Sequence, residues 1–272
     1  MRQDTRVSFR DAKKYDAHAL LEVVRREHVS PHMVRVTVAG EDLADYPDHG
    51  FDQWFRMFLP RPAEEGALGR LPHKVDLLGY WKYMRMPEGA RPVMRCYTVR
   101  ELRRHERQLD IDFVVHGDEG VAAPWAREAE PGDRLAIIDQ GTGYDLRDGI
   151  ENHLLVADDT GLPAVLGILR SLPRHHRGVA YIEIPDAADA QSHEAPDGLE
   201  VRWIVREPGA KAGSTVLAAV QAAPVPDPPF TAYLVGEQAL PTTLRRWLVH
   251  EHHVPKDRIA FVGYWREGRP YL

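Results

Sequence analysis

The chain contains a single cysteine, Cys96, among its 272 residues. One cysteine can form no internal disulfide and cannot supply the several thiolates that hold an iron–sulfur cluster. The sequence also lacks an apolar run of about 18 residues, the length that a membrane-spanning helix needs. Residues 1–16 are polar and charged, unlike a signal peptide with its apolar centre. We therefore expect a cytoplasmic protein that does not insert into a membrane.

Excess positive charge is also absent, since the formal net charge at pH 7 is −6. A nucleic-acid-binding surface usually needs a broad excess of lysine and arginine, so we expect no nucleic-acid partner. Binding of an anionic ligand therefore requires a local cluster of cationic side chains. Hydrophobic residues make up 43% of the chain, which at this length is ample for two cores of ordinary domain size.

The hydrophobic pattern changes near residues 149–153. Before this point, short strand-like runs are separated by proline and glycine, which is typical of an antiparallel barrel. The six runs lie at 20–24, 33–38, 54–59, 95–99, 109–115 and 134–138. We therefore predict a six-stranded antiparallel β-barrel domain over residues 1–149.

After this point, apolar strands alternate with helical patterns, which indicates a parallel sheet covered by helices. The predicted strands lie at 153–157, 179–184, 201–205, 231–235 and 259–262, and the predicted helices at 162–171, 214–222 and 240–252. The sequence therefore predicts an α/β domain over residues 150–272.

Two segments of the barrel half are suited to one cofactor. In Arg-Pro-Val-Met-Arg-Cys-Tyr-Thr-Val-Arg at 91–100, we predict a strand on which Arg95, Tyr97 and Thr98 share one face. They would offer a cation, an aromatic plane and a hydroxyl to one ligand. At 116–126, Gly117 and Gly120 precede small residues, so backbone N–H groups can approach a diphosphate. An ordinary half-buried strand with solvated arginines would also explain the first pattern.

The start of the α/β half offers a second ligand position. Residues 158–164 lie where the first parallel strand meets its helix, the crevice in which open parallel sheets usually bind ligands. A capped helix start explains the same residues equally well. Acidic Asp186 and Asp189 follow the second strand, and nothing basic there marks a pocket for a 2′-phosphate. The stretch at 141–144 lacks the third glycine of a dinucleotide fingerprint and precedes the first strand, so we predict a turn.

Two histidine-rich stretches could be taken for metal sites, but the sequence around them does not support this interpretation. His175 and His176 lie in a charged loop, and His250, His252 and His253 lie near a helix end, where solvated surface is the usual environment. No paired carboxylate or cysteine completes a metal cage, so we expect no native metal site. The long insertion at 61–90 carries aromatic and cationic residues that either contact a ligand or pack on the barrel.

The order and spacing of these motifs resemble the siderophore-interacting protein family, FAD-dependent ferric-siderophore reductases related to the ferredoxin reductases. The matching stretches are VSPHMVRVT at 29–37, RCYTVR at 95–100, DFVVHG at 112–117, ADDTGLPA at 157–164, GE at 236–237 and GYWR at 263–266. Where relatives usually carry Glu-Thr-Ala, this chain has Asp159, Thr160 and Gly161.

The resemblance implies roles for individual residues. Arg95 is expected to neutralise a flavin phosphate, Tyr97 to stack on the ring, and Thr98 to hydrogen-bond near its reactive nitrogen. The other expected cofactor contacts come from Val99, Arg100, His116, Gly117, Gly120, Ala122, Ala123, Trp125, Asp158 and Thr160. His116 is ambiguous, because a lone strand histidine is more often structural. Arg56 and Arg266 are the expected substrate contacts, and ordinary solvated charges are the alternative.

The resemblance also implies an activity. FAD would take electrons from NADH, NADPH or a ferredoxin and reduce a ferric siderophore, so that ferrous iron is released in the cytoplasm. The barrel would bind FAD and the α/β domain a nicotinamide nucleotide. Two alternatives stay open: a flavin reductase-like electron carrier for another acceptor, and a siderophore-binding protein without redox activity.

Overall fold

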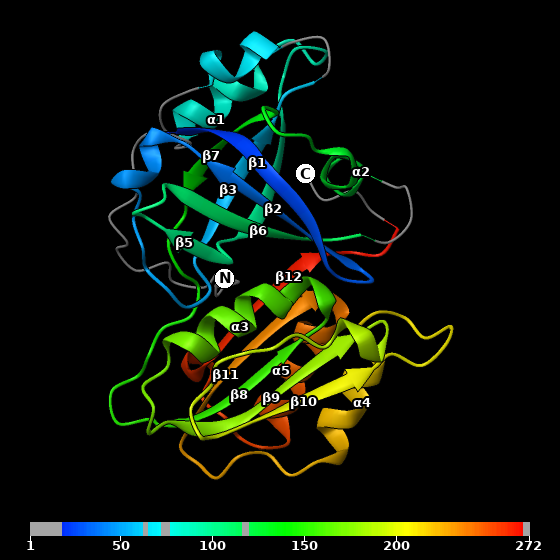
Figure 1. The fold of residues 1–272 in the computed structure, drawn as a ribbon. Helices are drawn as coiled ribbons and strands as arrows, with labels where there is room; N and C mark the ends of the chain where they lie inside the picture. Colours follow the sequence, from blue (N-terminus) through cyan, green and yellow to red (C-terminus); the bar gives the residue numbers. More distant parts are fainter. Residues whose placement is uncertain (1–17, 62–64, 72–76, 116–119, 269–272) are drawn as a thin grey trace. The chain divides into compact units, whose positions relative to one another are not determined.

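The structure, a computed structural model, describes residues 18–61, 65–71, 77–115 and 120–268. These residues form two compact units, which Figure 1 shows as ribbons. The barrel unit contains residues 18–49 and 53–142, and the α/β unit contains residues 50–52 and 143–268.

The barrel unit is built on one antiparallel sheet with the strand order β4-β3-β7-β1-β2-β6-β5. The strands are β1 (Ala19–Ser30), β2 (Met33–Ala39), β3 (Trp54–Leu59), β4 (Val93–Thr98), β5 (Glu101–Arg103), β6 (Gln108–Val114) and β7 (Arg134–Asp139). The predicted antiparallel fold is confirmed, but the sheet contains seven strands in the part of the chain that the structure describes, and there β4 and β5 are its edges. The sequence analysis missed β5 because three residues, two of them charged, give no hydrophobic alternation.

The sheet buries one face of each strand in the barrel core. Val34, Val36 and Val38 on β2 lie in that core together with Ile111 and Phe113 on β6. The alternate residues of the same strands point outward, as the two-residue period of a strand requires.

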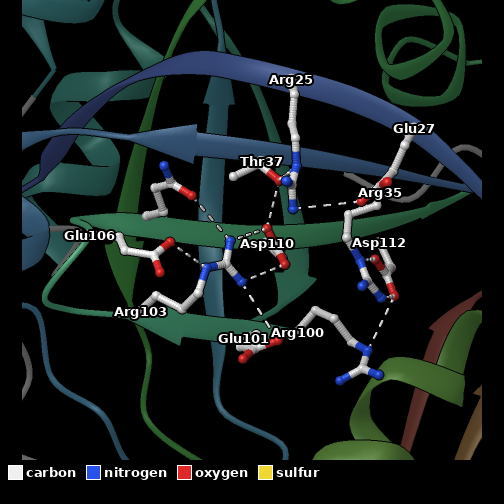
Figure 2. A network of polar contacts seen from close by, with 11 residues as sticks. Arg25, Glu27, Arg35, Thr37, Arg100, Glu101, Arg103, Glu106, Asp110 and Asp112 are labelled. Carbon is white, nitrogen blue, oxygen red and sulfur yellow. Dashed lines mark hydrogen bonds and ion pairs between the residues drawn. The ribbon is translucent and has the colours of Figure 1, made fainter. Parts of the chain in front are cut away.

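The outward residues form the network of charges in Figure 2. Arg35 binds Asp112 through two hydrogen bonds of 2.7 and 2.9 Å. Arg103 binds Asp110 through two of 2.8 Å, and the Thr37 hydroxyl donates to the same carboxylate at 2.7 Å. Because both aspartates are buried and doubly paired, this network ties β2, β5 and β6 together on the outer face.

Shorter elements complete the barrel unit. The 3-10 helix η1 (Glu41–Ala44) follows β2, and the insertion between β3 and β4 contains η2 (Glu65–Arg70) and the helix α1 (Leu77–Met84). Tyr83 of α1 packs edge-on against Phe58 of β3, with ring centroids 5.7 Å apart. Of the two interpretations of the insertion, packing on the barrel is therefore correct for Tyr83. The helix α2 (Ala122–Glu128) contacts β2 and β6.

The α/β unit is a parallel sheet with the order β10-β9-β8-β11-β12, as predicted. Its strands are β8 (Asn152–Ala157), β9 (Arg177–Ile184), β10 (Gly198–Val205), β11 (Phe230–Glu237) and β12 (Ile259–Trp265). Its helices are α3 (Leu162–Ser171), α4 (Ser214–Ala222) and α5 (Ala239–His250), with the 3-10 turns η3 (Asp159–Gly161), η4 (Ala187–Asp189) and η5 (Lys256–Arg258). The helix α3 covers one face of the sheet, and α4 and α5 cover the other (Figure 1).

One histidine assignment is wrong. His176 is buried, not solvated, and stacks on buried His153 with ring centroids 4.9 Å apart and a ring-nitrogen contact of 2.7 Å. Burial lowers the pKa of His153 to about 4, so this pair is neutral near pH 7. Among the described residues, no helix is long and apolar enough to span a bilayer.

Candidate functional site

The strand β4 presents the residues that the sequence analysis assigned to a flavin. In its pairing with β3, Arg95 lies opposite Met57 and Tyr97 opposite Phe55, both of which are core residues. These two side chains therefore share the inner face. Thr98, which is buried, lies one residue further along and belongs to the other face. The prediction that all three share a face was wrong for Thr98, because the side-chain period of a strand is two residues.

An aromatic cluster joins the two predicted cofactor segments. The ring of Tyr97 lies 4.4 Å from that of Phe113 on β6, which in turn lies 5.7 Å from the ring of Trp125 on α2. Burial raises the pKa of Tyr97, so its phenol is neutral at physiological pH. The sequence analysis did not single out Phe113, although it lies in a stretch used for the resemblance. His116 and Gly117 lie outside the described residues.

Charge is available beside this aromatic cluster. The Nη1 of Arg95 donates to the Met94 carbonyl at 2.8 Å, and Arg95 forms no ion pair with a described carboxylate. Arg100, in contrast, is paired with Asp112 at 3.4 Å. Arg95 is therefore the better placed of the two cations to meet a ligand phosphate.

Some backbone N–H groups around the cluster already donate to carbonyls, and others have no acceptor among the described residues. The amide of Val99 donates to the backbone carbonyl of Gln53 at 2.8 Å, and the amide of Arg100 donates to the backbone carbonyl of Asp110 at 3.0 Å. These two N–H groups are therefore already satisfied. The first turn of α2, which contains Ala122 and Ala123, has no side-chain cap. Its N–H groups lack helical partners, as at every helix start. Gly120 before it has a φ of 89°, a conformation that favours glycine.

At the carboxyl end of β8, Asp158 is fully buried and accepts four hydrogen bonds. Two come from the amide and hydroxyl of Thr160, at 3.0 and 2.5 Å. The others come from the Glu237 amide at 2.7 Å and the Trp265 indole at 3.1 Å. Asp158 therefore links the ends of β8, β11 and β12, and its oxygens are occupied by protein donors.

The adjacent Asp159 has a different environment. One of its oxygens lies 3.3 Å from Nη2 of Arg206, and its other oxygen is buried without a partner in the described structure. Arg206 is closer to buried Glu183, at 2.6 Å. Burial is the main cause that raises the pKa of Asp159 to about 7, and repulsion from Asp158 is the second. This carboxyl is therefore partly protonated at neutral pH.

A third buried acid, Asp52, was not anticipated by the sequence analysis. It accepts hydrogen bonds from the amides of Gly143 and Tyr144 and from the hydroxyl of Tyr233 at 2.9 Å. The predicted turn at 141–144 therefore contributes two amides to a carboxylate. The Tyr233 hydroxyl also contacts that of Tyr264 at 2.8 Å. No local pattern marks Asp52, because its partners lie about a hundred or more residues away.

The remaining predicted residues belong to different elements of the two units. Arg56 is on β3 of the barrel unit, opposite Cys96, and Arg266 is exposed after β12 in the α/β unit. Asp186 and Asp189 cap the turn η4 reciprocally, with bonds of 2.8 and 3.1 Å, so both carboxylates have a local structural role.

Comparison with known proteins bears on both units. A family model of the siderophore-interacting FAD-binding domain matches residues 22–143, and one of siderophore-interacting proteins matches residues 150–268. Ferric vibriobactin reductase ViuB of Vibrio cholerae is 32% identical over 252 residues, 92% of this chain and 90% of ViuB. The NADPH-dependent ferric-chelate reductase of Escherichia coli is 30% identical over 250 residues, 90% and 91% of the two chains. The crystal structure of the siderophore-interacting protein SipS from Aeromonas hydrophila is similar with a TM-score of 0.77 and 30% identity, covering 94% of each chain.

Proposed function

Because the chain belongs to the siderophore-interacting protein family, we propose that it is an oxidoreductase that uses FAD to reduce ferric siderophores. The observation that carries this proposal is the meeting of Tyr97, Phe113 and Trp125 beside Arg95, for which the described residues offer no carboxylate. The contact between the two segments expected to bind a flavin supports the proposal, since a phosphate would find a cation there and a ring would find aromatic surface.

The residues present fit FAD. Tyr97 and Trp125 would supply aromatic contacts, Arg95 would bind a phosphate, and the first-turn amides of Ala122 and Ala123 would bind the diphosphate. Bound FAD would supply the conversion between a two-electron donor and a one-electron acceptor. The chain's own residues would position the cofactor and exclude water from the aromatic cluster.

The substrate side of the proposal follows from iron chemistry. Catecholate and hydroxamate oxygens are hard ligands that prefer iron(III), so reduction to iron(II) weakens the complex and frees the metal. Catecholate complexes carry negative charge, and we propose that Arg56 and Arg266 attract them. We place the reaction in the cytoplasm, with NADH or NADPH as donor and a ferredoxin as the other candidate.

Anaerobic stopped-flow mixing tests the function directly. We expect NADH or NADPH to bleach the flavin of the purified protein, and a ferric siderophore to restore its oxidised spectrum. Faster reoxidation by free flavin or a protein acceptor than by any ferric siderophore would identify an electron carrier for another acceptor. A colourless preparation that cannot be reconstituted with FAD would identify a binding protein without redox activity.

Replacing Arg95 with Ala should weaken FAD binding. Loss of one charge-assisted contact to a phosphate costs about 1.5 to 3 kcal/mol, which corresponds to about a 10-fold to 100-fold increase in the dissociation constant. Flavin release measured by fluorescence checks the value. Arg104→Ala is the matched control, since Arg104 is an exposed arginine of the same unit, and it should leave FAD affinity unchanged. Equal FAD affinity in both variants would remove Arg95 from the site.

A further inference from the structure

The insertion between β3 and β4 carries four cations for which the described residues provide no carboxylate partner. They are Arg61, Lys82, Arg85 and Arg91, and no ion pair within the described ranges includes any of them. The chain as a whole is acidic, with a net charge of −6. One insertion of an acidic protein therefore holds a group of positive charges without a carboxylate partner among the described residues.

Three of these cations contact other residues of the insertion. Arg61 donates to the Arg91 carbonyl at 3.2 Å, and Arg91 donates to the Met84 carbonyl at 3.3 Å. The guanidinium of Arg85 lies 3.8 Å from the centre of the Trp81 ring. We call Arg61, Trp81, Lys82, Met84, Arg85 and Arg91 the cationic patch.

The patch also exposes two large apolar side chains. Trp81 is 51% exposed and Met84 is 47% exposed, and they lie one helical turn apart on α1. The helix cannot rotate to bury them, because Tyr83 is fixed beneath it. The Tyr83 ring packs on Phe58, and its hydroxyl donates to the Pro92 carbonyl at 2.7 Å. The outward position of Trp81 and Met84 is therefore built into the fold, and Figure 1 shows α1 on the outer side of the sheet.

We propose that the cationic patch binds the surface of an anionic lipid membrane. Lysine and arginine side chains attract anionic headgroups, and each contributes separately to binding. Tryptophan favours the level of the headgroups, where its ring is in an apolar layer and its N–H stays in a polar one. Met84 supplies further apolar surface beside it. The protein would associate peripherally, in agreement with the absence of a membrane-spanning helix among the described residues.

The small size of the patch favours a lipid surface over a protein partner. A stable protein interface buries about 800 Å² on each partner and needs a matching shape. The patch is one face of an eight-residue helix with three neighbouring arginines, and its apolar centre is two side chains. A lipid surface adapts to such a projecting group without a minimum area.

Sedimentation of the FAD-loaded full chain with vesicles tests the proposal. We expect binding to phosphatidylcholine vesicles that contain phosphatidylglycerol, little binding to phosphatidylcholine alone, and weaker binding as salt rises. Each cation near the surface is worth about a fivefold change in the partition coefficient, so Lys82→Gln with Arg85→Gln should lower it about 25-fold. Trp81→Ala should lower it as well.

The matched control is Arg104→Gln with Arg246→Gln, which removes the same charge from exposed arginines outside the patch. This control should bind vesicles as the wild type does, and thermal unfolding verifies that each variant is folded. Equal losses in the two double variants, or equal binding to neutral vesicles, would overturn the proposal. Absence of vesicle binding combined with Lys82-dependent and Arg85-dependent binding of an acidic ferredoxin would also overturn it, in favour of a protein partner.

Discussion

Asp159→Asn is expected to make the α/β unit more stable at pH 8 while leaving its stability near pH 4 almost unchanged. In the folded protein the pKa of Asp159 is raised from its ordinary 3.8 to about 7. The folded state therefore binds more protons than the unfolded state between these two values. The stability from this carboxyl is fully present below about pH 4 and is lost as pH rises to about 7.

The size of the effect follows from the pKa shift. A shift of about three pH units corresponds to about 4 kcal/mol in the free energy of unfolding, and Asn removes this dependence. Asp158, Glu183 and Arg206 are the charged groups that face Asp159, and they stay in place in the variant. Urea unfolding of both proteins from pH 4 to pH 8 gives the difference curve. A flat curve would mean that Asp159 titrates in the folded protein as it does in the unfolded chain.

Asp158→Ala should lower the free energy of unfolding of the α/β unit by at least about 3 kcal/mol. The substitution leaves the amides of Thr160 and Glu237 and the Trp265 indole without an acceptor. Each buried donor that loses its partner costs about 1 to 3 kcal/mol. Chemical denaturation measures the loss.

Asp148→Ala is the control for that variant, because Asp148 is an exposed aspartate of the same unit and should change stability by less than about 0.5 kcal/mol. The experiment also decides between two roles of Asp158. A variant with wild-type stability but weaker NAD(P)H binding would assign the carboxylate to the nucleotide, contrary to its hydrogen bonds in the structure.

Local patterns in the sequence were enough to predict most of the fold. The helix α3 begins and ends where its sequence predicts, because Pro163 fits a first helical turn and the apolar residues have helical spacing. The strands β8 and β11 were found because buried strands are continuous apolar runs. The short strand β5 was missed because its stability comes from tertiary contacts, including the two bonds between Arg103 and Asp110.

The candidate site was less accessible to sequence reasoning. Tyr97 and Trp125 follow from the family resemblance, but the contact that joins them is Phe113, which looks like any other apolar strand residue. The roles of buried acids were also hidden. Asp158 fits a ligand site by its position, yet Glu237 and Trp265, whose N–H groups occupy one of its oxygens, lie 79 and 107 residues further along the chain.

The strand order of the barrel unit has a consequence for synthesis on the ribosome. The strand β7 lies between β3 and β1 and pairs with both, so in the described sheet its ladder hydrogen bonds connect the pair β4-β3 to the group β1-β2-β6-β5. A growing chain can form the β1–β2 hairpin early. The strands β3 and β1, however, cannot pair with β7 until residues 134–139 have left the ribosome. Long-range pairing of this kind is slow, and strand edges stay exposed until it is complete. A chain that stops before β7 would therefore leave the facing edges of β3 and β1 without their partner strand and exposed to solvent.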